Sequence, residues 1–423
     1  MSVVRPRGTT DVLPPRSERW HLREERFREV CRLFGYPEIL LPLFEHAELF
    51  QRTVGETSDI VVKELYAFSD RSGRLLALRP EGTAPAARAY LENGLHQGPQ
   101  PVKLAYIGPM FRYERPQSGR YRQHTQMGIE LFGAPEPGAD VEVISLAVEY
   151  LRRESIADLT IRLNSIGCPA CRPAYRDALR AFIDPILPEL CEDCRARHGR
   201  NPLRVLDCKV ERCRQALGGA PRTQDGLCDQ CREHFGAVRR QLGVLKLPLE
   251  IDPSLVRGLD YYTRTVFEVV HHEAGSQHAL CGGGRYDGLV EILGGPPTPG
   301  VGFGMGLERV LDLAERLEEG TPSSYRPELF LAVAGEEVRD RALTLAAGAR
   351  CAGVATTIDF GTRSLKAQLK NASRLGAAFS LVLGQREIEA GMGCLRDMGD
   401  GSEYPVALDR LVETVRHLAG RKD

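Results

Sequence analysis

The chain has 423 residues, 42% of them hydrophobic and 27% charged, a balance that is typical of globular proteins and argues against long disordered stretches. At about 150 residues per domain, this length predicts two or three domains. The 56 lysine and arginine residues nearly balance the 57 aspartate and glutamate residues, which excludes a protein-wide basic field, so nucleic acid would have to bind a local patch. No apolar run approaches the roughly 18 residues that a membrane helix needs, and we expect a cytoplasmic protein without a membrane partner.

The first predicted elements are a helix, a strand and a hairpin. Apolar residues recur at helical spacing over 17–34, which predicts an amphipathic helix. The apolar run 38–42 predicts a short strand at a sheet edge or a bulge, because it ends in a proline. Residues 64–78 predict a hairpin around a turn sequence of Asp, Arg, Ser and Gly.

Further along the chain, strand-like and helical patterns surround one segment of different composition. Two strands are expected within 103–132, a helix over 141–152, a strand over 261–270 and a helix over 307–317. Residues 167–242 are rich in cysteine and arginine and have little strand character, so we expect an inserted module.

Eight of the twelve cysteines lie in this segment, as the pairs Cys168/Cys171, Cys191/Cys194, Cys208/Cys213 and Cys228/Cys231. Disulfides are rare in the cytosol, and three pairs have the C-x₂-C spacing of structural zinc sites. Eight thiolates suffice for two tetrahedral zinc sites, with reduced thiols, a degenerated site or disulfides as the alternatives. The spacing does not indicate which pairs share a metal. The other four cysteines, at positions 31, 281, 351 and 394, are expected to be ordinary buried residues.

The C-terminal part predicts a separate small domain. Residues 318–326 have the composition of a linker. Apolar runs at 329–333, 354–358 and 379–383 then alternate with helical stretches at 336–349, 364–373 and 408–418. This alternation predicts an α/β domain with a mainly parallel sheet.

The first group of residues with chemical meaning is an arginine cluster. Four arginines lie within 111–122 of an otherwise neutral chain. Guanidinium groups bind phosphates bidentately, so this loop suits a nucleoside triphosphate or an RNA end, with a solvated surface loop as the alternative. On the next predicted strand, alternation places Gln126, Gly128 and Glu130 on one face, where a ligand could lie close to the backbone.

Three further segments add candidate residues. Glu81 and Thr83 lie at a turn that enters a helix, where they could cap it or receive an ammonium group. Residues 257–263 combine Arg, Asp and paired tyrosines, as a site or as a packing corner. The glycine-rich runs within 282–306 match neither a dinucleotide fingerprint nor a Walker loop, but they permit a flat ligand to approach the backbone.

Together these segments resemble the histidyl-tRNA synthetase family of class II aminoacyl-tRNA synthetases. Residues 111–122 resemble class II motif 2, residues 302–309 resemble motif 3, and residues 41–45 resemble motif 1, which forms a dimer interface in the family. Residues 257–262 and 283–288 resemble the two histidine-specific signatures, which make the match specific.

The resemblance implies an α+β fold. An antiparallel-sheet catalytic core of the class II type would occupy 1–166 and 243–320, interrupted by the helical, Cys-rich insert at 167–242. An α/β anticodon-binding domain would occupy 327–423. The implied activity is that of a histidine–tRNA ligase, which makes histidyl-adenylate from L-histidine and ATP and transfers histidine to the 3′ end of histidine tRNA. A homodimer is implied as well.

The resemblance also implies roles for individual residues. Arg257 would lie at the α-phosphate of ATP, and Mg²⁺ is expected with ATP. The implied histidine-binding residues are Glu81, Thr83, Gln126, Glu130, Tyr261, Tyr262 and Tyr286. The implied ATP-binding residues are Arg112, Arg120, His124 and Arg309, and the implied catalytic residues are Arg257, Arg112 and Arg309.

Two features depart from the family pattern. His124-Thr125 stands where many relatives have Phe-His, and the flat His124 ring could stack on adenine in place of the phenylalanine. The second departure is the Cys-rich insert, and the resemblance does not support zinc there. Two other functions were considered: a non-catalytic regulatory subunit of ATP phosphoribosyltransferase, and an RNA-binding module. The regulatory subunit typically lacks an anticodon-binding domain and part of the catalytic residues. In this chain we expect the domain and the catalytic residues to be present.

Overall fold

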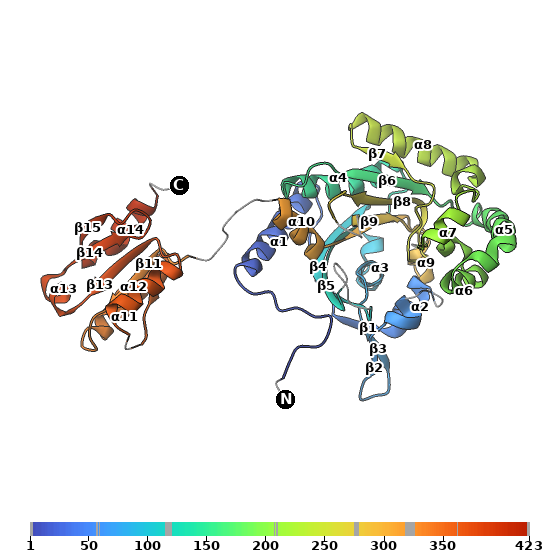
Figure 1. The fold of residues 1–423 in the computed structure, drawn as a ribbon. Helices are drawn as coiled ribbons and strands as arrows, with labels where there is room; N and C mark the ends of the chain where they lie inside the picture. Colours follow the sequence, from blue (N-terminus) through green and yellow to red (C-terminus); the bar gives the residue numbers. More distant parts are fainter. Residues whose placement is uncertain are drawn as a thin grey trace. The chain divides into compact units, whose positions relative to one another are not determined.

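The computed structural model describes residues 3–55, 58, 60–114, 121–206, 208, 210–274, 279–317, 326–361 and 363–420. The chain divides into two compact units, residues 1–321 and 322–423, whose elements are labelled in Figure 1. Among the described residues, no helix combines the length and the apolar character that crossing a membrane requires.

The larger unit is built on a mainly antiparallel sheet. Its strand order is β4-β5-β10-β9-β8-β6-β7, in which only the β6–β7 pair is parallel among the described strands. The strands are β4 (Val102–Phe111), β5 (Gln123–Phe132), β6 (Thr160–Ser165), β7 (Leu249–Ile251), β8 (Thr263–Val270), β9 (Ala279–Arg285) and β10 (Gly300–Gly306). The expected antiparallel core is confirmed.

One face of this sheet packs on helices. Met127, Ile129 and Leu131 of β5 share a buried core with apolar residues of these helices. Because side chains alternate along a strand, the even-numbered residues of β5 face the other way. The helices on the packed face are α1 (Arg16–Leu33), α4 (Pro137–Arg153), α8 (Asp229–Val244) and α10 (Leu307–Leu317).

The opposite face carries a second, smaller core. Helices α3 (Thr83–Glu92) and α9 (Leu289–Ile292) contribute Ala87, Tyr90, Leu289 and Val290 to it, and the paired tyrosines at 261–262 join them. This arrangement places the start of α3 beside the polar face of β5.

A small sheet near the N-terminus has the strand order β1-β3-β2, formed by β1 (Phe44–His46), β2 (Ala67–Ser69) and β3 (Leu75–Leu78). The predicted hairpin is confirmed, although its first strand begins three residues later than expected. The predicted strand at 38–42 is wrong, because only Glu38 pairs there, as an isolated bridge to Ala105. Pro37 precedes this run and Pro42 ends it, and neither has an N–H to donate to a ladder. Three further elements belong to this N-terminal part of the chain: α2 (Ala47–Val54), η1 (Ile60–Glu64) and η2 (Leu95–Gln97).

The cysteine-rich segment is helical in its described residues. It has a small core of its own, which includes Leu179, Ile183, Leu190 and Val205. Its last helix, α8, instead contributes Phe235 and other residues to the main core. The elements before α8 are α5 (Arg172–Ile183), η3 (Asp184–Glu189), α6 (Glu192–Arg200), η4 (Pro202–Val205), α7 (Glu211–Ala216) and η5 (Thr223–Gly226).

The smaller unit has a sheet of strand order β12-β11-β13-β14-β15, with β11 (Leu329–Val333), β12 (Thr356–Ile358), β13 (Phe379–Leu383), β14 (Met392–Asp397) and β15 (Glu403–Ala407). The three predicted strands pair in parallel, while β14 and β15 form an antiparallel extension that the sequence pattern missed. Its helical elements are α11 (Arg339–Cys351), α12 (Leu365–Arg374), α13 (Gln385–Ala390), η6 (Leu408–Arg410) and α14 (Leu411–Ala419). Cys31 and Cys281 of the larger unit are buried as expected, but Cys351 and Cys394 of this unit are exposed, so that expectation was wrong for them.

Candidate active site

The polar face of β5 lies over a glycine-lined floor. Gln126, Gly128 and Glu130 share this face, as the alternation predicted. In the register between β10 and β5, Gly302 pairs with Glu130 and Gly304 with Gly128. A Cβ atom at Gly302 would collide with the Glu130 carboxylate, and one at Gly304 with the Gln126 amide. The glycines of β10 therefore make room for the polar side chains of its neighbour.

Glu130 is the centre of the polar cluster. Its side chain is fully buried, and its carboxylate accepts hydrogen bonds from the hydroxyls of Thr83 at 2.7 Å, Tyr106 at 3.1 Å and Tyr286. Burial disfavours the charged form and raises the pKa of Glu130 to about 8, although these hydroxyls oppose the shift. The site thus presents a carboxyl group whose charge is sensitive to what binds beside it.

Glu81 caps the start of helix α3 and also belongs to the polar cluster around Glu130. Its two carboxylate oxygens accept from the backbone N–H groups of Thr83 at 2.7 Å and Ala84 at 2.9 Å, so it caps the start of α3. The hydroxyl of Tyr261 lies 3.5 Å from it. Burial raises the pKa of Glu81. The capping alternative is confirmed, and Thr83 connects the same carboxylate to Glu130.

Tyr106 is a site residue that the sequence analysis missed. Its hydroxyl accepts from the Gln126 amide at 3.0 Å and donates to Glu130, so it joins the two polar residues of β5. Tyr106 pairs with Gly128 across the β4–β5 ladder, and a Cβ atom at Gly128 would collide with the tyrosine hydroxyl. A large residue opposite a glycine is the only signal of this role, and it requires the strand register.

Three tyrosines pack together beside this polar cluster. The rings of Tyr261 and Tyr262 lie 4.8 Å apart, and the rings of Tyr261 and Tyr286 meet edge to face at 5.8 Å. All three side chains are buried. The structure therefore brings together all seven residues assigned to histidine by resemblance: Glu81, Thr83, Gln126, Glu130, Tyr261, Tyr262 and Tyr286.

A second group of residues is basic. The Nε of Arg112 donates to the carbonyl of Pro80 at 2.8 Å, and Nη1 of Arg309 donates to the carbonyl of Ala279 at 3.0 Å. Burial, together with the charges of Arg112 and Arg309, lowers the pKa of His124 to about 3. His124 is therefore a neutral ring between two guanidinium groups. Arg120 lies outside the described residues.

Glu308 connects this basic group to helix α10 and was not among the sequence candidates. Its carboxylate accepts from the backbone N–H of Thr125 at 2.7 Å. Burial raises the pKa of Glu308 to about 7. This bond fixes the start of α10, and with it Arg309, to the strand that carries His124.

Arg257 approaches the sheet from the turn before β8. It forms an ion pair with Glu268 of β8, which orients the guanidinium group. A Cβ atom at Gly282 would collide with that group, so the glycine in β9 allows it to lie against the backbone. Glu268 is a further residue that sequence reasoning missed, because its contact with Arg257 depends on the path of the turn.

The comparisons with known proteins agree with this geometry. The family described as "Histidyl-tRNA synthetase" matches residues 8–169 and 199–310, and "Anticodon binding domain" matches residues 328–418. The "Histidine--tRNA ligase" of Desulforudis audaxviator is 54% identical over 421 residues, which cover 99% of this chain and 100% of that relative. The chain belongs to the histidyl-tRNA synthetase family.

Other relatives support this membership. The "Histidine--tRNA ligase" of Pelotomaculum thermopropionicum is 49% identical over 423 residues, all of this chain and of that relative. The crystal structure of apo histidyl-tRNA synthetase from S. aureus has a TM-score of 0.83 and 36% identity, and it covers 98% of this chain and 100% of that chain. A Bacillus halodurans structure described as an "ATP phosphoribosyltransferase regulatory subunit/histidyl-tRNA synthetase" has a TM-score of 0.64 at 24% identity, covers 88% of this chain and 97% of that chain, and shows only a shared fold.

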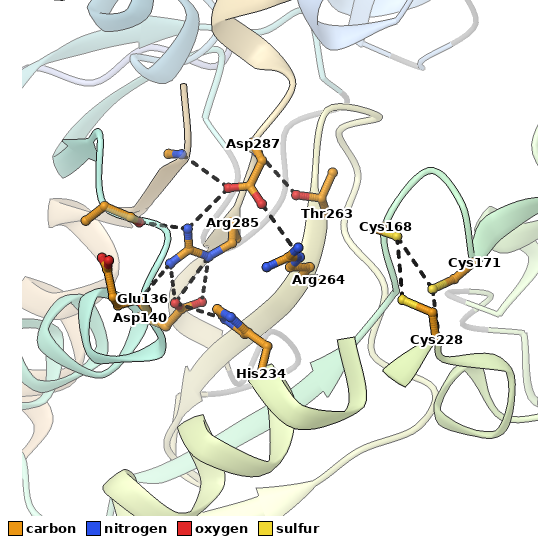
Figure 2. A network of polar contacts seen from close by, with 12 residues as sticks. Glu136, Asp140, Cys168, Cys171, Cys228, His234, Thr263, Arg264, Arg285 and Asp287 are labelled. Atoms are coloured by element: carbon orange, nitrogen blue, oxygen red, sulfur yellow. Dashed lines mark hydrogen bonds and ion pairs between the residues drawn. The ribbon is translucent and has the colours of Figure 1, made fainter. Parts of the chain in front are cut away.

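In this family member, the arginine of the second histidine signature lies away from the pocket. Arg285 is fully buried and binds the Asp140 carboxylate at 2.5 Å and the Ala134 carbonyl at 2.9 Å. Nε2 of His234 lies 3.2 Å from the same carboxylate, and Asp287 also contacts Arg285 at 3.2 Å (Figure 2). This network joins β9, α4 and α8 and therefore ties the last helix of the cysteine-rich segment to the core.

The eight cysteines of the segment gather into two groups of four. One group is Cys168, Cys171, Cys228 and Cys231, and the other is Cys191, Cys194, Cys208 and Cys213. Within each group the Sγ atoms lie within 4.8 Å of one another, and none forms a disulfide. Figure 2 shows three members of the first group beside the Arg285 network. The structure thus supplies the pairing that the spacing left open.

Proposed function

We propose that this chain activates L-histidine with ATP and transfers it to the 3′ end of histidine tRNA. The observation that carries the proposal is Glu130, a buried carboxyl group that accepts from three hydroxyls, beside the packed rings of Tyr261, Tyr262 and Tyr286. An imidazole N–H fits such an acceptor. Its relatives at 54% and 49% identity, matched over their full length, are both ligases of this kind.

The histidine substrate would be held at both ends. An α-ammonium group has three donors, and Glu81, Thr83 and Gln126 offer acceptor oxygens beside the pocket. Glu130 would accept from the ring, with Tyr262 and Tyr286 around it. An amino acid without ring nitrogens would leave buried polar groups unpaired, and sites of this kind can discriminate by about 10⁴.

The basic group would bind ATP. Arg112 and Arg309 would clamp the phosphates, and Arg120 would contact the nucleotide from the motif 2 loop. His124 would stack on adenine, which its neutral state supports because a neutral ring adds no repulsion to the flanking guanidinium groups. Mg²⁺ would accompany ATP, as the family's use of ATP implies.

Arg257 would stabilise the charge that develops at the α-phosphate. Its ion pair with Glu268 holds the guanidinium before substrate arrives, and a group fixed in advance stabilises a transition state without further reorganisation. Glu268 is thus a positioning residue in this scheme. Preorganised donors of this kind contribute a factor of about 10²–10³ in rate.

The proposal includes a homodimer that forms through the motif 1 region. Large apolar side chains are exposed around β1, β2 and β3, and exposed apolar patches often mark protein interfaces. They are Leu40, Leu43, Phe44, Phe68 and Leu75.

The proposal also assigns a role to each domain of the chain. The catalytic core would occupy 1–166 and 243–320, the insert 167–242 and the anticodon-binding domain 327–423, with structural zinc for the eight cysteines of the insert. The enzyme would work in the cytoplasm, where its tRNA substrate is found. The regulatory-subunit alternative gains no support, because the relatives that match the whole chain are ligases.

Aminoacylation tests the proposal. Purified protein, ATP, Mg²⁺ and labelled histidine should charge a histidine tRNA transcript, and a transcript without the terminal adenosine should stay uncharged. Charging with a different amino acid, or no charging, would refute the proposed reaction.

A further inference from the structure

The two cysteine groups have the geometry of metal sites. We call Cys168, Cys171, Cys228 and Cys231 the proximal cluster, and Cys191, Cys194, Cys208 and Cys213 the distal cluster. A tetrahedral zinc ion with Zn–S bonds of about 2.3 Å places its sulfur atoms roughly 3.8 Å apart. The measured separations are 3.6 Å for Cys168–Cys171, 4.0 Å for Cys168–Cys228 and 3.8 Å for Cys191–Cys208.

The surroundings of the sulfur atoms also suit thiolates. The backbone N–H of Cys228 points at Sγ of Cys171 at 3.2 Å, and the N–H of Cys191 points at Sγ of Cys213 at 3.2 Å. Such donors stabilise negative charge on sulfur, and a thiolate is the form that binds a metal. In each cluster, two cysteine pairs from different parts of the segment converge on one point, which a role in hydrophobic packing would not require.

The distal cluster closes a loop that reaches the active-site turn. Residues 195–207 lie between Cys194 and Cys208, and this loop carries Asn201 and Arg204. The Asn201 amide donates to the Asp260 carboxylate at 2.9 Å, and Nη1 of Arg204 donates to the Gly258 carbonyl at 2.5 Å. Both acceptors belong to the turn 257–262, which also carries Arg257, Tyr261 and Tyr262.

Near the proximal cluster, the segment is linked through Asn164 to the residues that precede this turn. Cys228 follows η5, from which Thr223 and Gln224 each donate to Oδ1 of Asn164 at 3.2 Å. The Asn164 amide in turn donates to the carbonyl of Leu255 at 3.0 Å. The cysteine-rich segment therefore contacts the turn directly near the distal cluster, and near the proximal cluster it reaches the residue Leu255, just before the turn, only through Asn164.

We propose that each cluster binds one structural zinc ion and that the distal ion makes Asn201 and Arg204 positioning residues for Arg257, Tyr261 and Tyr262. The helices beside the distal cysteines are short, with 9 residues in α6 and 6 in α7. Helices of this length are marginal alone, and metal binding supplies folding free energy to such segments. The distal ion fixes the loop, the loop fixes the turn, and the turn fixes the catalytic and histidine-binding side chains. The second half of this inference rests on the proposed function, and the metal sites do not.

Metal content tests the sites without reference to activity. Protein purified under reducing, chelator-free conditions should contain about two zinc ions per chain by elemental analysis. The double variants Cys208→Ser/Cys213→Ser and Cys228→Ser/Cys231→Ser should each retain one, and Cys351→Ser, which changes an exposed cysteine of the other unit, should retain both. Cobalt(II) added to chelator-treated protein should give the visible absorption of tetrahedral thiolate coordination. Wild-type protein without stoichiometric metal would overturn the proposal, as would double variants with the full zinc content.

Kinetics test the positioning role. Arg204→Ala and Asn201→Ala should keep both zinc ions but reduce kcat/KM for histidine in pyrophosphate exchange by about ten- to a hundred-fold, since small misplacements in an active site are costly. Cys208→Ser/Cys213→Ser should show a similar loss, while KM for ATP stays within about two-fold of wild type. Arg204→Lys should restore part of the activity, because an ammonium group can still donate to the Gly258 carbonyl.

The matched control is Arg195→Ala, at an exposed position next to Cys194 in α6, which should leave the kinetics unchanged. A role limited to stability would lower the melting temperature of Arg204→Ala and Asn201→Ala without changing kcat/KM below it, and that result would overturn the positioning role. If wild-type protein shows no histidine-dependent exchange, the proposed function fails, while the zinc stoichiometry still decides the metal sites.

Discussion

The hydroxyl of Thr83 lies 2.7 Å from a carboxylate oxygen of Glu130, and this bond joins the first turn of α3 to the middle of β5. Tyr106 and Tyr286 reach the same carboxylate from β4 and from the end of β9. Four segments that are distant in the sequence therefore meet at one buried acceptor. Such a network is ordered before substrate binds, so its side chains lose less conformational entropy on binding.

Tyr106→Phe should weaken histidine recognition selectively. The variant removes one donor to Glu130 and the acceptor of the Gln126 amide, while the ring still fills its place. A hydrogen bond between neutral groups contributes about 0.5–1.5 kcal/mol, so KM for histidine at pH 7 should rise roughly two- to ten-fold. The measurement is pyrophosphate exchange with varied histidine and then varied ATP.

The matched control for this variant is Tyr150→Phe, which removes a buried hydroxyl that donates to the Arg23 carbonyl at 3.4 Å, outside the pocket. It should leave KM for histidine near the wild-type value. Equal effects of the two substitutions, or a change in KM for ATP alone, would contradict the assignment of Tyr106.

Glu130→Gln should change how histidine use depends on pH. Burial raises the pKa of Glu130 to about 8, so in the free site this group is mainly protonated at pH 7 and ionises as the pH rises. Because the ionised carboxylate is the better acceptor for an imidazole N–H, kcat/KM for histidine should increase with pH, with its midpoint near pH 8, and level off above about pH 9. The glutamine variant cannot ionise, so its lower activity should lack this rise. A pH profile with the same rise in both proteins would exclude Glu130 as its source.

The sequence predicts those features of the structure that depend on residues close together along the chain. Helix α10 has the predicted bounds, because its apolar spacing is complete and a glycine-rich strand precedes it. The shared face of Gln126 and Glu130 was likewise predictable from alternation alone. The run 38–42 failed because its prolines limit strand pairing, which a pattern of apolar residues does not reveal.

Non-local relationships were beyond the sequence pattern. Tyr106 could not be assigned because its role follows from pairing with Gly128 across the β4–β5 ladder. The grouping of Cys168 with Cys228 depends on the path of the chain across a sequence separation of 60, and no spacing rule encodes that path. The β14–β15 hairpin was missed because its strands, at 392–397 and 403–407, alternate in burial and lack a continuous apolar run.

Arg257→Ala should slow adenylate formation while leaving substrate binding largely intact. The guanidinium group is proposed to stabilise charge at the α-phosphate, and loss of such a donor costs about 10²–10³ in kcat. KM for histidine and for ATP should change by only a few-fold, which places the effect in the transition state. Arg257→Lys is the comparison variant, since it keeps the positive charge but loses the bidentate hydrogen-bonding geometry of the guanidinium group. An unchanged exchange rate in Arg257→Ala would refute the role.

Leu40→Glu combined with Phe44→Glu should convert the protein from dimer to monomer. Both side chains are exposed, Leu40 at 84% and Phe44 at 54%, and burying a carboxylate in an apolar interface is unfavourable. Light scattering during size-exclusion chromatography measures the mass directly. Val244→Glu is the control, because Val244 is 80% exposed at the end of α8, and this variant should remain dimeric. A monomeric wild-type protein would contradict the proposed dimer.

The central claim is that the pocket around Glu130 activates histidine. Histidine-dependent exchange between ATP and labelled pyrophosphate measures that step without tRNA, using purified full-length protein and a panel of the common amino acids. The account predicts rapid exchange with histidine and none above background with the others, and a strong loss in Glu130→Gln. No exchange with histidine, or equal exchange with several amino acids, would contradict it.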